Sequence, residues 1–537
     1  MPILSIGSGL FASVAWRVAA LALAIRGVLA LRPFAVLDNL FVPDDTWYTL
    51  AIARSLAHGG PPAVDGLTPT SGFQPLLAFL QVPLIWLVGE DLLLPAQGTI
   101  WLAALADAAA AGLLAALGQR SAGPQGWWAG LLWAVSPVAI GNALGGLETS
   151  LALALQLAIV LQLARLAAAL VPAGPAAKTP LLLLGLTCGL ALLARVDSAF
   201  VVAGAGLVVW RWYGLAAASQ VAAVAALVVA TWWGWCTVHL GSPVPESGAA
   251  VRAITQIQHT SSWLDLRSIV ALAAGTLLPA PVVEGTPVRD ALYFGGPLAW
   301  LGGLFWLGLV GWGLRQVAGR LPLWVWPLVA QAAAVLLLYV AWVPAVWFFR
   351  RYFEPVLAVQ ALALGCGLAH WQQTRPALAR PVLALCVAVS SLQVGLFAVT
   401  TPQTSIDTDW HGAKGYAKPA LQILSALPDG AVVGALQSGA LAWFANGRVR
   451  VVNLDGVVDG EAAAAYKSKR LLQFCKKRGV SHLADWPFNL QFLRQHDAAG
   501  PLAKVALQTV HQASPQGPRD AFVLVAVDWT GWPVAQP

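Results

Sequence analysis

The sequence predicts an α-helical polytopic membrane protein that crosses the bilayer about eleven times and ends in a soluble α/β domain. Hydrophobic residues make up 58% of the 537 positions, and charged residues only 10%. The mean hydropathy is +0.71. Soluble domains carry roughly 25% charged residues. A soluble protein of this length would need a charged surface, and the region before residue 400 does not provide one.

Composition also narrows the classes of function. The formal net charge of +7 is modest, so it indicates membrane topology rather than nucleic-acid binding. Four of the five cysteines lie in apolar stretches and the fifth is alone in the tail, so we expect neither disulfides nor a cysteine metal site. The first basic residue is Arg17, and no small-residue cleavage site follows a short apolar core, so no cleavable signal peptide is predicted.

Apolar runs long enough to cross the hydrocarbon, ~17–25 residues, follow one another along the chain. One run, 180–212, is interrupted at Arg195–Ser198, and we interpret it as two short spans that meet at this polar point. The segment Gln74–Gly89 is short and contains two prolines, which favours an interfacial or re-entrant helix. The continuous spans are expected near residues 10–31, 96–118, 126–143, 149–170, 218–240, 294–314, 322–345, 354–372 and 381–399.

Basic residues predict the orientation, because cytoplasmic loops carry an excess of Lys and Arg. With the N-terminus inside, the turn at Glu148, the loop 240–292 and the tail fall outside. We therefore expect a membrane domain at 1–400 with an outer loop at 38–95, and an outer domain, periplasmic or extracellular, at 401–537. The protein would be a multi-pass protein of the cell (inner) membrane. Its inner loops would carry Arg120, Lys178, Arg211, Arg315, Arg320, Arg375 and Arg380.

The tail has the pattern of a small α/β domain. A helical stretch at Glu461–Arg478 ends at Gly479, and its basic residues suit a solvated face, with contact to anionic headgroups as the alternative. Asp455 follows a strand, as the ribose-binding acid of dinucleotide folds does. No glycine-rich phosphate loop precedes it, so we discount nucleotide binding. The expected strands are Ala431–Gln437, Arg448–Leu454, Val480–Asp485 and Ala521–Asp528.

Acidic residues mark two points on the outer side. Asp44 and Asp45 follow the first span and precede a short amphipathic helix that ends near His58. Adjacent carboxylates can take a proton from an attacking hydroxyl or hold a hard cation. The alternative is helix capping, which accounts for one Asp and leaves the other. Glu148 is alone in a short turn, where a carboxylate beside a bilayer needs solvent, a partner or a ligand; a solvated turn residue is the alternative.

Outer-side arginines form the second group of candidates. Guanidinium groups suit the phosphate of a lipid carrier, because they make charge-assisted bidentate bonds. The alternatives are snorkelling toward headgroups and, for Arg195, an ion pair with Asp197. No two histidines have the helical spacing of zinc ligands, so zinc is not expected. The candidates for phosphate binding are Arg195, Arg252, Arg350 and Arg351, with Tyr352 beside them.

The first outer loop resembles that of GT-C superfamily glycosyltransferases, through Asp44–Tyr48 and Pro69–Leu76. These membrane enzymes use polyprenyl-phosphate sugars, and they include arabinofuranosyl-, mannosyl- and aminoarabinose transferases. Further similar stretches occur in the same order, and the resemblance covers most of residues 10–400. They are the Gly-Leu-Glu148-Thr turn, the Leu-Leu-Ala-Arg195-Val-Asp197 stretch, the Gly-Ser-Pro-Val-Pro-Glu-Ser loop and Arg351-Tyr352 with Pro355.

The resemblance implies roles for these residues. Asp44 or Asp45 would bind the acceptor or act as the base, Glu148 would be the second acid, and the basic residues would hold the donor phosphate. Some members need a divalent metal, so a site for Mg, Mn or Ca at Asp44 and Glu148 is one expectation, and no other cofactor is implied. Arg252 departs from the pattern, because relatives more often carry Lys there, and the two bind phosphate with different geometry.

We therefore expect an enzyme, a hexosyl- or pentosyltransferase of GT-C type that contributes to a cell-envelope glycan. It would transfer a sugar from a lipid-phosphate donor to a hydroxyl of a glycan, lipid or protein acceptor on the outer face, with inversion. Its other partner is membrane lipid, and no nucleic acid is expected. One alternative is a transporter or lipid flippase, which predicts mid-span ionisable residues and paired broken helices. Another is a catalytically inactive scaffold, which would leave the outer acids unexplained.

Overall fold

The computed structural model describes residues 4–89, 91–169, 175–260, 321–345, 348–400, 415–487, 506–512 and 522–530, with a few further residues between these ranges. The chain forms two compact units, and each consists of three segments. The first unit is Met1–Arg32, Ile100–Trp232 and Ser262–Pro402. The second is Pro33–Thr99, Trp233–Ser261 and Gln403–Pro537.

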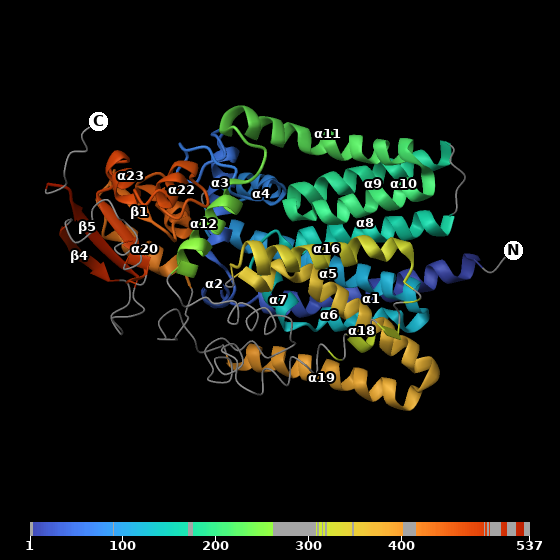
Figure 1. The fold of residues 1–537 in the computed structure, drawn as a ribbon. Coiled ribbons are helices and arrows are strands. Elements are labelled where there is room, and N and C mark those ends of the chain that lie inside the picture. Colours follow the sequence, from blue (N-terminus) through green and yellow to red (C-terminus); the bar gives the residue numbers. More distant parts are fainter. Residues whose placement is uncertain are drawn as a thin grey trace. The chain divides into compact units, whose positions relative to one another are not determined.

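The first unit is helical, and Figure 1 shows its helices running roughly parallel to one another. Buried Ala, Leu and Val side chains from several of them form one hydrophobic core. Two helices, α5 (Leu94–Ala122) and α11 (Leu215–Leu240), extend across the boundary from one unit to the other. The other elements are α1 (Leu4–Ala30), η1 (Pro124–Trp127), α6 (Trp128–Ala134), α7 (Pro137–Leu144), α8 (Thr149–Ala169), α9 (Pro175–Ala194), η2 (Val196–Ser198), α10 (Ala199–Tyr213), η4 (Leu323–Val325), α16 (Trp326–Leu337), η5 (Leu338–Trp342), α17 (Phe349–Tyr352), α18 (Glu354–Thr374) and α19 (Pro376–Thr400).

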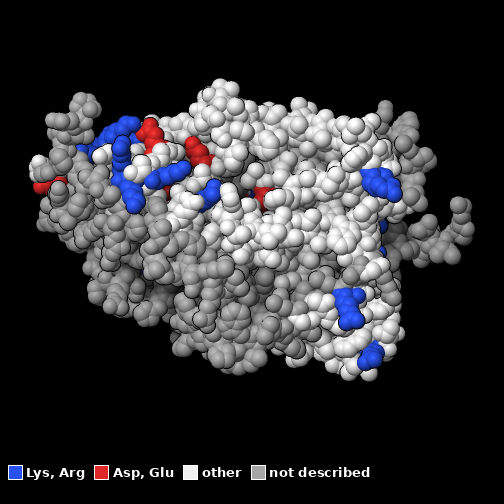
Figure 2. Space-filling view, viewed as in Figure 1, with Lys and Arg blue, Asp and Glu red and all other residues white. Residues whose placement is uncertain are grey.

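Four helices of the described chain are long and apolar enough to cross a membrane. A fifth span exists if the two helices at Pro124–Ala134 and Pro137–Leu144, bent by 56°, count as one. Figure 2 shows large areas over α8 to α11 without any charged side chain, as lipid contact requires. The chain is thus a helical multi-span membrane protein, and eleven spans stay a prediction; the span expected at 294–314 lies almost wholly outside the described residues. The four helices are Leu94–Ala122, Thr149–Ala168, Leu215–Leu240 and Leu323–Trp342.

Two of the expected runs are broken. The run at 180–212 is two helices, α9 and α10, joined by η2, as the polar residues at its centre predicted. The run expected as one span at 126–143 also breaks, between α6 and α7. Pro137 explains this break, because proline has no N–H to donate and disfavours helical backbone in the residue before it.

Arg26 of α1 stabilises the broken end of α6. Its side chain is fully buried, and it donates to Asp107 Oδ2 at 2.6 Å and to the carbonyl of Ala134, also at 2.6 Å. Trp133 Nε1 donates to the other oxygen of Asp107 at 2.9 Å. An unpaired arginine would cost ~2.5–3.5 kcal/mol at a span centre. Here Asp107 neutralises the charge, and Arg26 satisfies a carbonyl that the helix end leaves without an intrahelical partner.

The second unit contains a five-stranded sheet of order β2-β1-β3-β5-β4. β1, β2 and β3 are parallel, while β5 is antiparallel to β3 and β4 is antiparallel to β5. A core of buried Leu, Val and Phe side chains joins the sheet to two short helices. The strands are β1 (Val432–Ala435), β2 (Arg450–Asn453), β3 (His482–Asp485), β4 (Ala506–Gln512) and β5 (Val523–Asp528). The helices are α2 (Phe34–Leu40), α3 (Asp44–Ala57), α4 (Pro75–Val88), α12 (Glu246–Thr260), α20 (Ala417–Ser425), α21 (Gly439–Ala445), α22 (Gly460–Lys467) and α23 (Leu471–Lys477).

The tail is α/β as expected, with two differences. All four expected strands are present, and β4 is an additional one. The single helix expected at 461–478 is wrong: the stretch forms α22 and α23, separated at Ser468–Arg470. Lys469 has a φ of 55° there, a left-handed conformation that interrupts the helix.

Candidate active site

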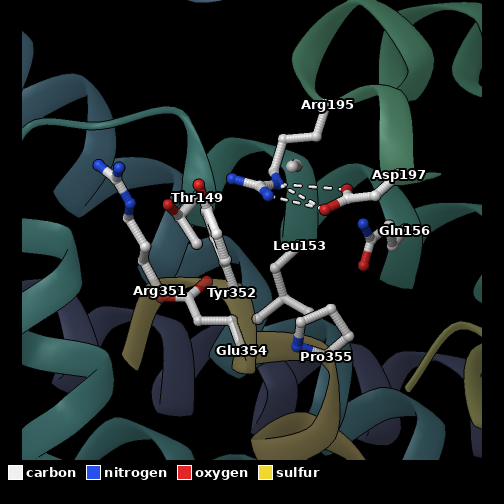
Figure 3. Close-up of a pocket in the computed structure, with 10 residues that line it drawn as sticks. Thr149, Leu153, Gln156, Arg195, Asp197, Arg351, Tyr352, Glu354 and Pro355 are labelled. Atoms are coloured by element: carbon white, nitrogen blue, oxygen red, sulfur yellow. Dashed lines mark hydrogen bonds and ion pairs between the residues drawn. The ribbon is translucent and has the colours of Figure 1, made fainter. Parts of the chain in front are cut away.

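A pocket lies in the first unit where the start of α8, the end of α9 and the start of α18 meet (Figure 3). α8 and α9 are consecutive helices packed on each other, so the first turn of one lies beside the last turn of the other. The pocket is small, with a cavity volume of about 10 Å³, roughly the room that one water molecule needs. Its lining residues are Thr149, Ala152, Leu153, Gln156, Arg195, Asp197, Arg351, Tyr352, Glu354 and Pro355.

Arg195 is held by two carboxylates and a tyrosine. It follows α9 in an extended conformation, so its side chain leaves the helix direction. Nη1 donates to Glu148 Oε1 at 2.8 Å, and Nη2 donates to Asp197 Oδ2 at 2.7 Å. Nε also donates to Asp197, and Nη2 to the hydroxyl of Tyr339 at 3.2 Å. Arg195, Glu148 and Asp197 are all at least 90% buried. The ion pair of Arg195 with Asp197, expected as the alternative to phosphate binding, is therefore present. Arg195 is also the partner of Glu148.

Aromatic rings border the same pocket. Tyr339, which donates to Asp197 at 2.8 Å, stacks on Tyr352 with ring centroids 4.1 Å apart. The guanidinium carbon of Arg195 lies 5.0 Å from the Tyr352 ring centroid, and that of Arg351 lies 5.4 Å from it. Figure 3 shows the two guanidinium groups approaching from different sides of Tyr352. Tyr339 belongs to a π-helical turn, Leu338–Trp342, a conformation frequent at functional sites.

Three of the lining side chains present a buried oxygen that has no hydrogen-bond partner in the described part of the chain. These are Thr149 Oγ1, Gln156 Oε1 and Glu354 Oε2. Buried polar atoms are nearly always hydrogen-bonded, and each exception costs about 1–3 kcal/mol. Three such atoms belong to the lining of one pocket, where a bound molecule can pair with them.

The two first-loop acids differ in their surroundings. Asp44 is buried; its Oδ2 accepts from the backbone N–H of Gly439 at 2.8 Å, and its Oδ1 accepts from that of Ala440 at 2.9 Å. Both donors belong to the first turn of α21. Asp44 therefore caps a helix, but not the helix that it begins. Asp45 is only partly buried, and it is the acid that capping does not explain.

The carboxyl ends of β1 and β2 are covered by Tyr48 of α3. Its hydroxyl donates to the carbonyl of Leu436 at 2.9 Å and accepts from the side chain of Asn453 at 3.1 Å. Ligands of open α/β sheets bind at such strand ends, and here a side chain occupies the position. Asp455 accepts from the N–H of Val457, so it stabilises a turn.

Burial raises the pKa of several carboxyl groups in this region of the second unit. It raises the pKa of Asp44 to about 7, although the two backbone N–H groups of α21 lower it. Burial likewise raises the pKa of Asp38 to about 7 and that of Asp455 to about 8. Asp38 accepts from the N–H of Ala417 at 3.0 Å, so it too joins the first loop to the tail within this unit.

The remaining predicted residues are not all in the pocket. Arg351 and Tyr352 line it, whereas Arg350 does not; the backbone carbonyl of Arg350 accepts from Asn142 at 3.1 Å. Arg252 lies on α12, in the second unit, and is not a lining residue. Glu354, Gln156 and Tyr339 were not predicted. Glu354 carried the same signal as Glu148, a lone acid at the end of an apolar run.

A divalent metal at Asp44 and Glu148 finds no support in the donor atoms. Both oxygens of Asp44 accept from backbone N–H groups, and Glu148 pairs with Arg195. Within the described residues, no group of three or more His, Cys, Asp or Glu side chains is arranged to hold a metal ion. We therefore derive no step through a metal, and metal dependence stays a prediction.

No protein-family profile matches the chain. No curated protein matches it by sequence either.

Solved structures of two membrane enzymes match the fold. ArnT from Cupriavidus metallidurans, in the apo state, has a TM-score of 0.55 at 15% identity and covers 95% of this chain and 97% of its own. The same protein bound to undecaprenyl phosphate has a TM-score of 0.54 at 15% identity, with the same coverage. The archaeal oligosaccharyltransferase AglB from Archaeoglobus fulgidus, with an inhibitory peptide and a dolichol-phosphate, has a TM-score of 0.52 at 12% identity and covers 89% of this chain and 69% of its own. The chain therefore has the GT-C fold of the polyprenyl-phosphate glycosyltransferases ArnT and AglB over most of its length.

Proposed function

We propose that this protein transfers one sugar from a polyprenyl-phosphate donor to a hydroxyl of an acceptor on the outer face of a membrane, with inversion. The observation that carries the proposal is the pocket of the first unit. It combines arginine side chains with buried oxygens that lack a partner among the described residues. ArnT, which shares the fold, has been solved with undecaprenyl phosphate bound, and AglB with a dolichol-phosphate.

The arginines are suited to different tasks. A guanidinium has five N–H donors. The contacts of Arg195 with Glu148, Asp197 and Tyr339 use four of them, which leaves one on Nη1 without a partner among the described residues. Two carboxylates also neutralise its charge. In this proposal Arg351 is the main contact of the donor phosphate, and Arg195 supplies one further N–H from a fixed position.

These contacts would stabilise the leaving group. When the bond between the anomeric carbon and the phosphate oxygen breaks, the oxygen takes the electron pair and the phosphate gains negative charge. Fixed guanidinium groups stabilise such charge without reorganisation, and this electrostatic effect is usually the largest contribution to catalysis. The aromatic border of Tyr339 and Tyr352 would exclude water from the same place.

Asp45 is the candidate base that the sequence supplies, and its assignment rests on the first-loop motif. The acceptor hydroxyl gives its proton to the carboxylate as its oxygen attacks the anomeric carbon on the face opposite the phosphate, which inverts that carbon. Asp44 is less suited, because both of its oxygens already accept from α21. Glu148 is ion-paired with Arg195, so we assign it the positioning of that arginine.

The alternatives have less support. A transporter would use ionisable groups within its spans, but the pair Arg26 and Asp107 is fully buried and its atoms are occupied by each other, by Trp133 and by backbone carbonyls. An inactive scaffold would leave the three buried oxygens of the pocket without a function.

The proposal is tested with purified protein in lipid nanodiscs and a panel of polyprenyl-phosphate sugars. A membrane extract supplies the acceptor, and nucleotide sugars serve as control donors. Mass spectrometry should detect free polyprenyl phosphate and a product heavier by one sugar, with a lipid-linked donor only. Transport of the intact lipid across vesicles without chemical conversion would support the transporter and contradict the enzyme.

A further inference from the structure

Glu354 is the residue of the pocket whose chemistry is least explained by phosphate binding. It is the first residue of α18, and only 1% of its surface is exposed. Oε1 accepts from Asn142 Nδ2 at 2.9 Å, and this bond joins α18 to α7. Oε2 is equally buried, and the described residues offer it no donor. One oxygen of Glu354 is thus bonded within the protein, while the other has no donor among the described residues.

The chemistry of Oε2 restricts that ligand. A carboxylate oxygen accepts hydrogen bonds, and an ionised phosphate has only acceptors to offer. An ionised Glu354 is therefore not satisfied by phosphate, since two negative groups would repel each other in a buried site. A sugar ring carries several hydroxyl groups, each of which can donate. The arginines of the pocket match the phosphate of a lipid-linked sugar, and Glu354 matches its hydroxyls.

We propose that Glu354 accepts a hydrogen bond from a hydroxyl of the transferred sugar, and that this contact selects the donor sugar. The inference rests on the proposed function, since it names which part of the donor a specific residue contacts. Sites built to bond a hydroxyl reject analogues that lack it, because the protein group is then left buried and unpaired. Glu354 would therefore discriminate by the presence and position of one hydroxyl.

Glu354→Gln separates this role from the structural one. Its amide oxygen can still accept from Asn142, so the bond between α7 and α18 is retained. Its amide nitrogen replaces Oε2, so the acceptor of the pocket becomes a donor. Glu461→Gln is the matched control, because Glu461 is 56% exposed on α22 and outside the pocket.

The experiment measures two quantities for the wild type and each variant. The first is kcat/KM for the best polyprenyl-phosphate sugar of the panel, and the second is the affinity for undecaprenyl phosphate, which has no sugar. For Glu354→Gln we expect kcat/KM to fall about 10- to 150-fold, the loss of one hydrogen bond to a charged group. Binding of undecaprenyl phosphate and the melting temperature should equal those of the wild type and of Glu461→Gln. One donor that lacks a single hydroxyl should react more slowly with the wild type than the complete donor does. With this deoxy donor, the wild type and Glu354→Gln should react at equal rates.

Three outcomes would overturn the inference. Equal kcat/KM values of wild type and variant for every donor would show that Oε2 contacts no sugar. An equal loss of undecaprenyl phosphate binding would show that Glu354 supports the phosphate site instead. No turnover by the wild-type protein with any lipid-linked sugar would overturn the proposed function, and this inference with it; the first two outcomes leave the proposed function standing.

Discussion

The carboxylate of Asp44 accepts a hydrogen bond from the backbone N–H of Gly439 at 2.8 Å, across 395 positions of sequence. The second oxygen of Asp44 does the same for Ala440. These N–H groups begin α21, where no earlier turn of the helix can satisfy them, and the helix dipole favours a negative charge there. The first outer loop is therefore part of the same compact unit as the sheet.

Replacing Gly439 by Ala should disrupt this contact. An added Cβ would lie 2.3 Å from the backbone oxygen of Asp44, so α3 and α21 would have to move apart. We expect a loss of about 1–3 kcal/mol, typical of overpacking, seen as a lower melting temperature in detergent. Gly248→Ala on α12 is the control, because its Cβ would meet nothing within 4 Å. Equal melting temperatures for the two variants would show that the contact is loose.

The two first-loop acids should respond differently to amide substitution. Asp45→Asn should lower transfer about 10²- to 10⁴-fold, the usual range for loss of a general base, and leave the melting temperature unchanged. Asp44→Asn should lower the melting temperature, because an amide has one acceptor oxygen and leaves one N–H of α21 unpaired. Turnover assays and thermal unfolding separate the effects. Near-wild-type turnover of Asp45→Asn would remove it from the mechanism.

The stability of the second unit should fall as pH rises. The pKa of Asp44 is about 7 and that of Asp455 about 8 in the folded protein, against ~3.9 for an unperturbed Asp. Between these values the unfolded chain binds fewer protons, so stability is greatest below about pH 4, is lost as pH rises toward 8, and is level above that.

Hydrogen exchange of the Gly439 and Ala440 amides measures this, after correction for the intrinsic effect of pH. Protection should fall from pH 5 to pH 8, and the slope should be smaller in Asp44→Asn, which lacks one titrating group. Protection that increases with pH would contradict the raised pKa values.

The acids, the pocket and the tail must face one compartment if they serve one substrate. Single cysteines in a cysteine-free background test this at positions 67, 122, 177, 317, 377 and 515. Leu67 is 65% exposed, and its side chain can be replaced without loss of a hydrogen bond among those described. A membrane-impermeant maleimide should label only 67 and 515 on intact cells, with any outer membrane permeabilised. Labelling at 67 without 515 would place the tail inside, so 180–212 would cross once.

Much of the fold could be predicted because its signals are local. The break at Arg195–Ser198 stood out as charge within an apolar run, and β1, β2, β3 and β5 as short apolar runs between turn residues. The break between α22 and α23 was missed, because no Gly or Pro marks it, and a left-handed Lys469 is not visible in a residue pattern.

The site could be predicted only in part, because its contacts are long-range. The pairing of Arg195 with Asp197 spans two residues and was foreseen as an alternative. The bond from Asp44 to Gly439 joins residues 395 positions apart, and no local pattern signals it. Gln156 and Tyr339 each lie in an apolar helix, where a single polar residue is common. Only packing brings Gln156 to the pocket and Tyr339 to Arg195.

The claim that the pocket holds the donor phosphate is tested most directly at two adjacent arginines. Arg351 lines the pocket and Arg350 does not, although they have the same charge and are both partly buried. With the active donor of the panel, Arg351→Ala should lower kcat/KM about 10- to 150-fold, the loss of a charge-assisted hydrogen bond of ~1.5–3 kcal/mol. Arg350→Ala should change it by about twofold or less, as is usual away from a site. Equal losses in the two variants, or none in Arg351→Ala, would contradict the account.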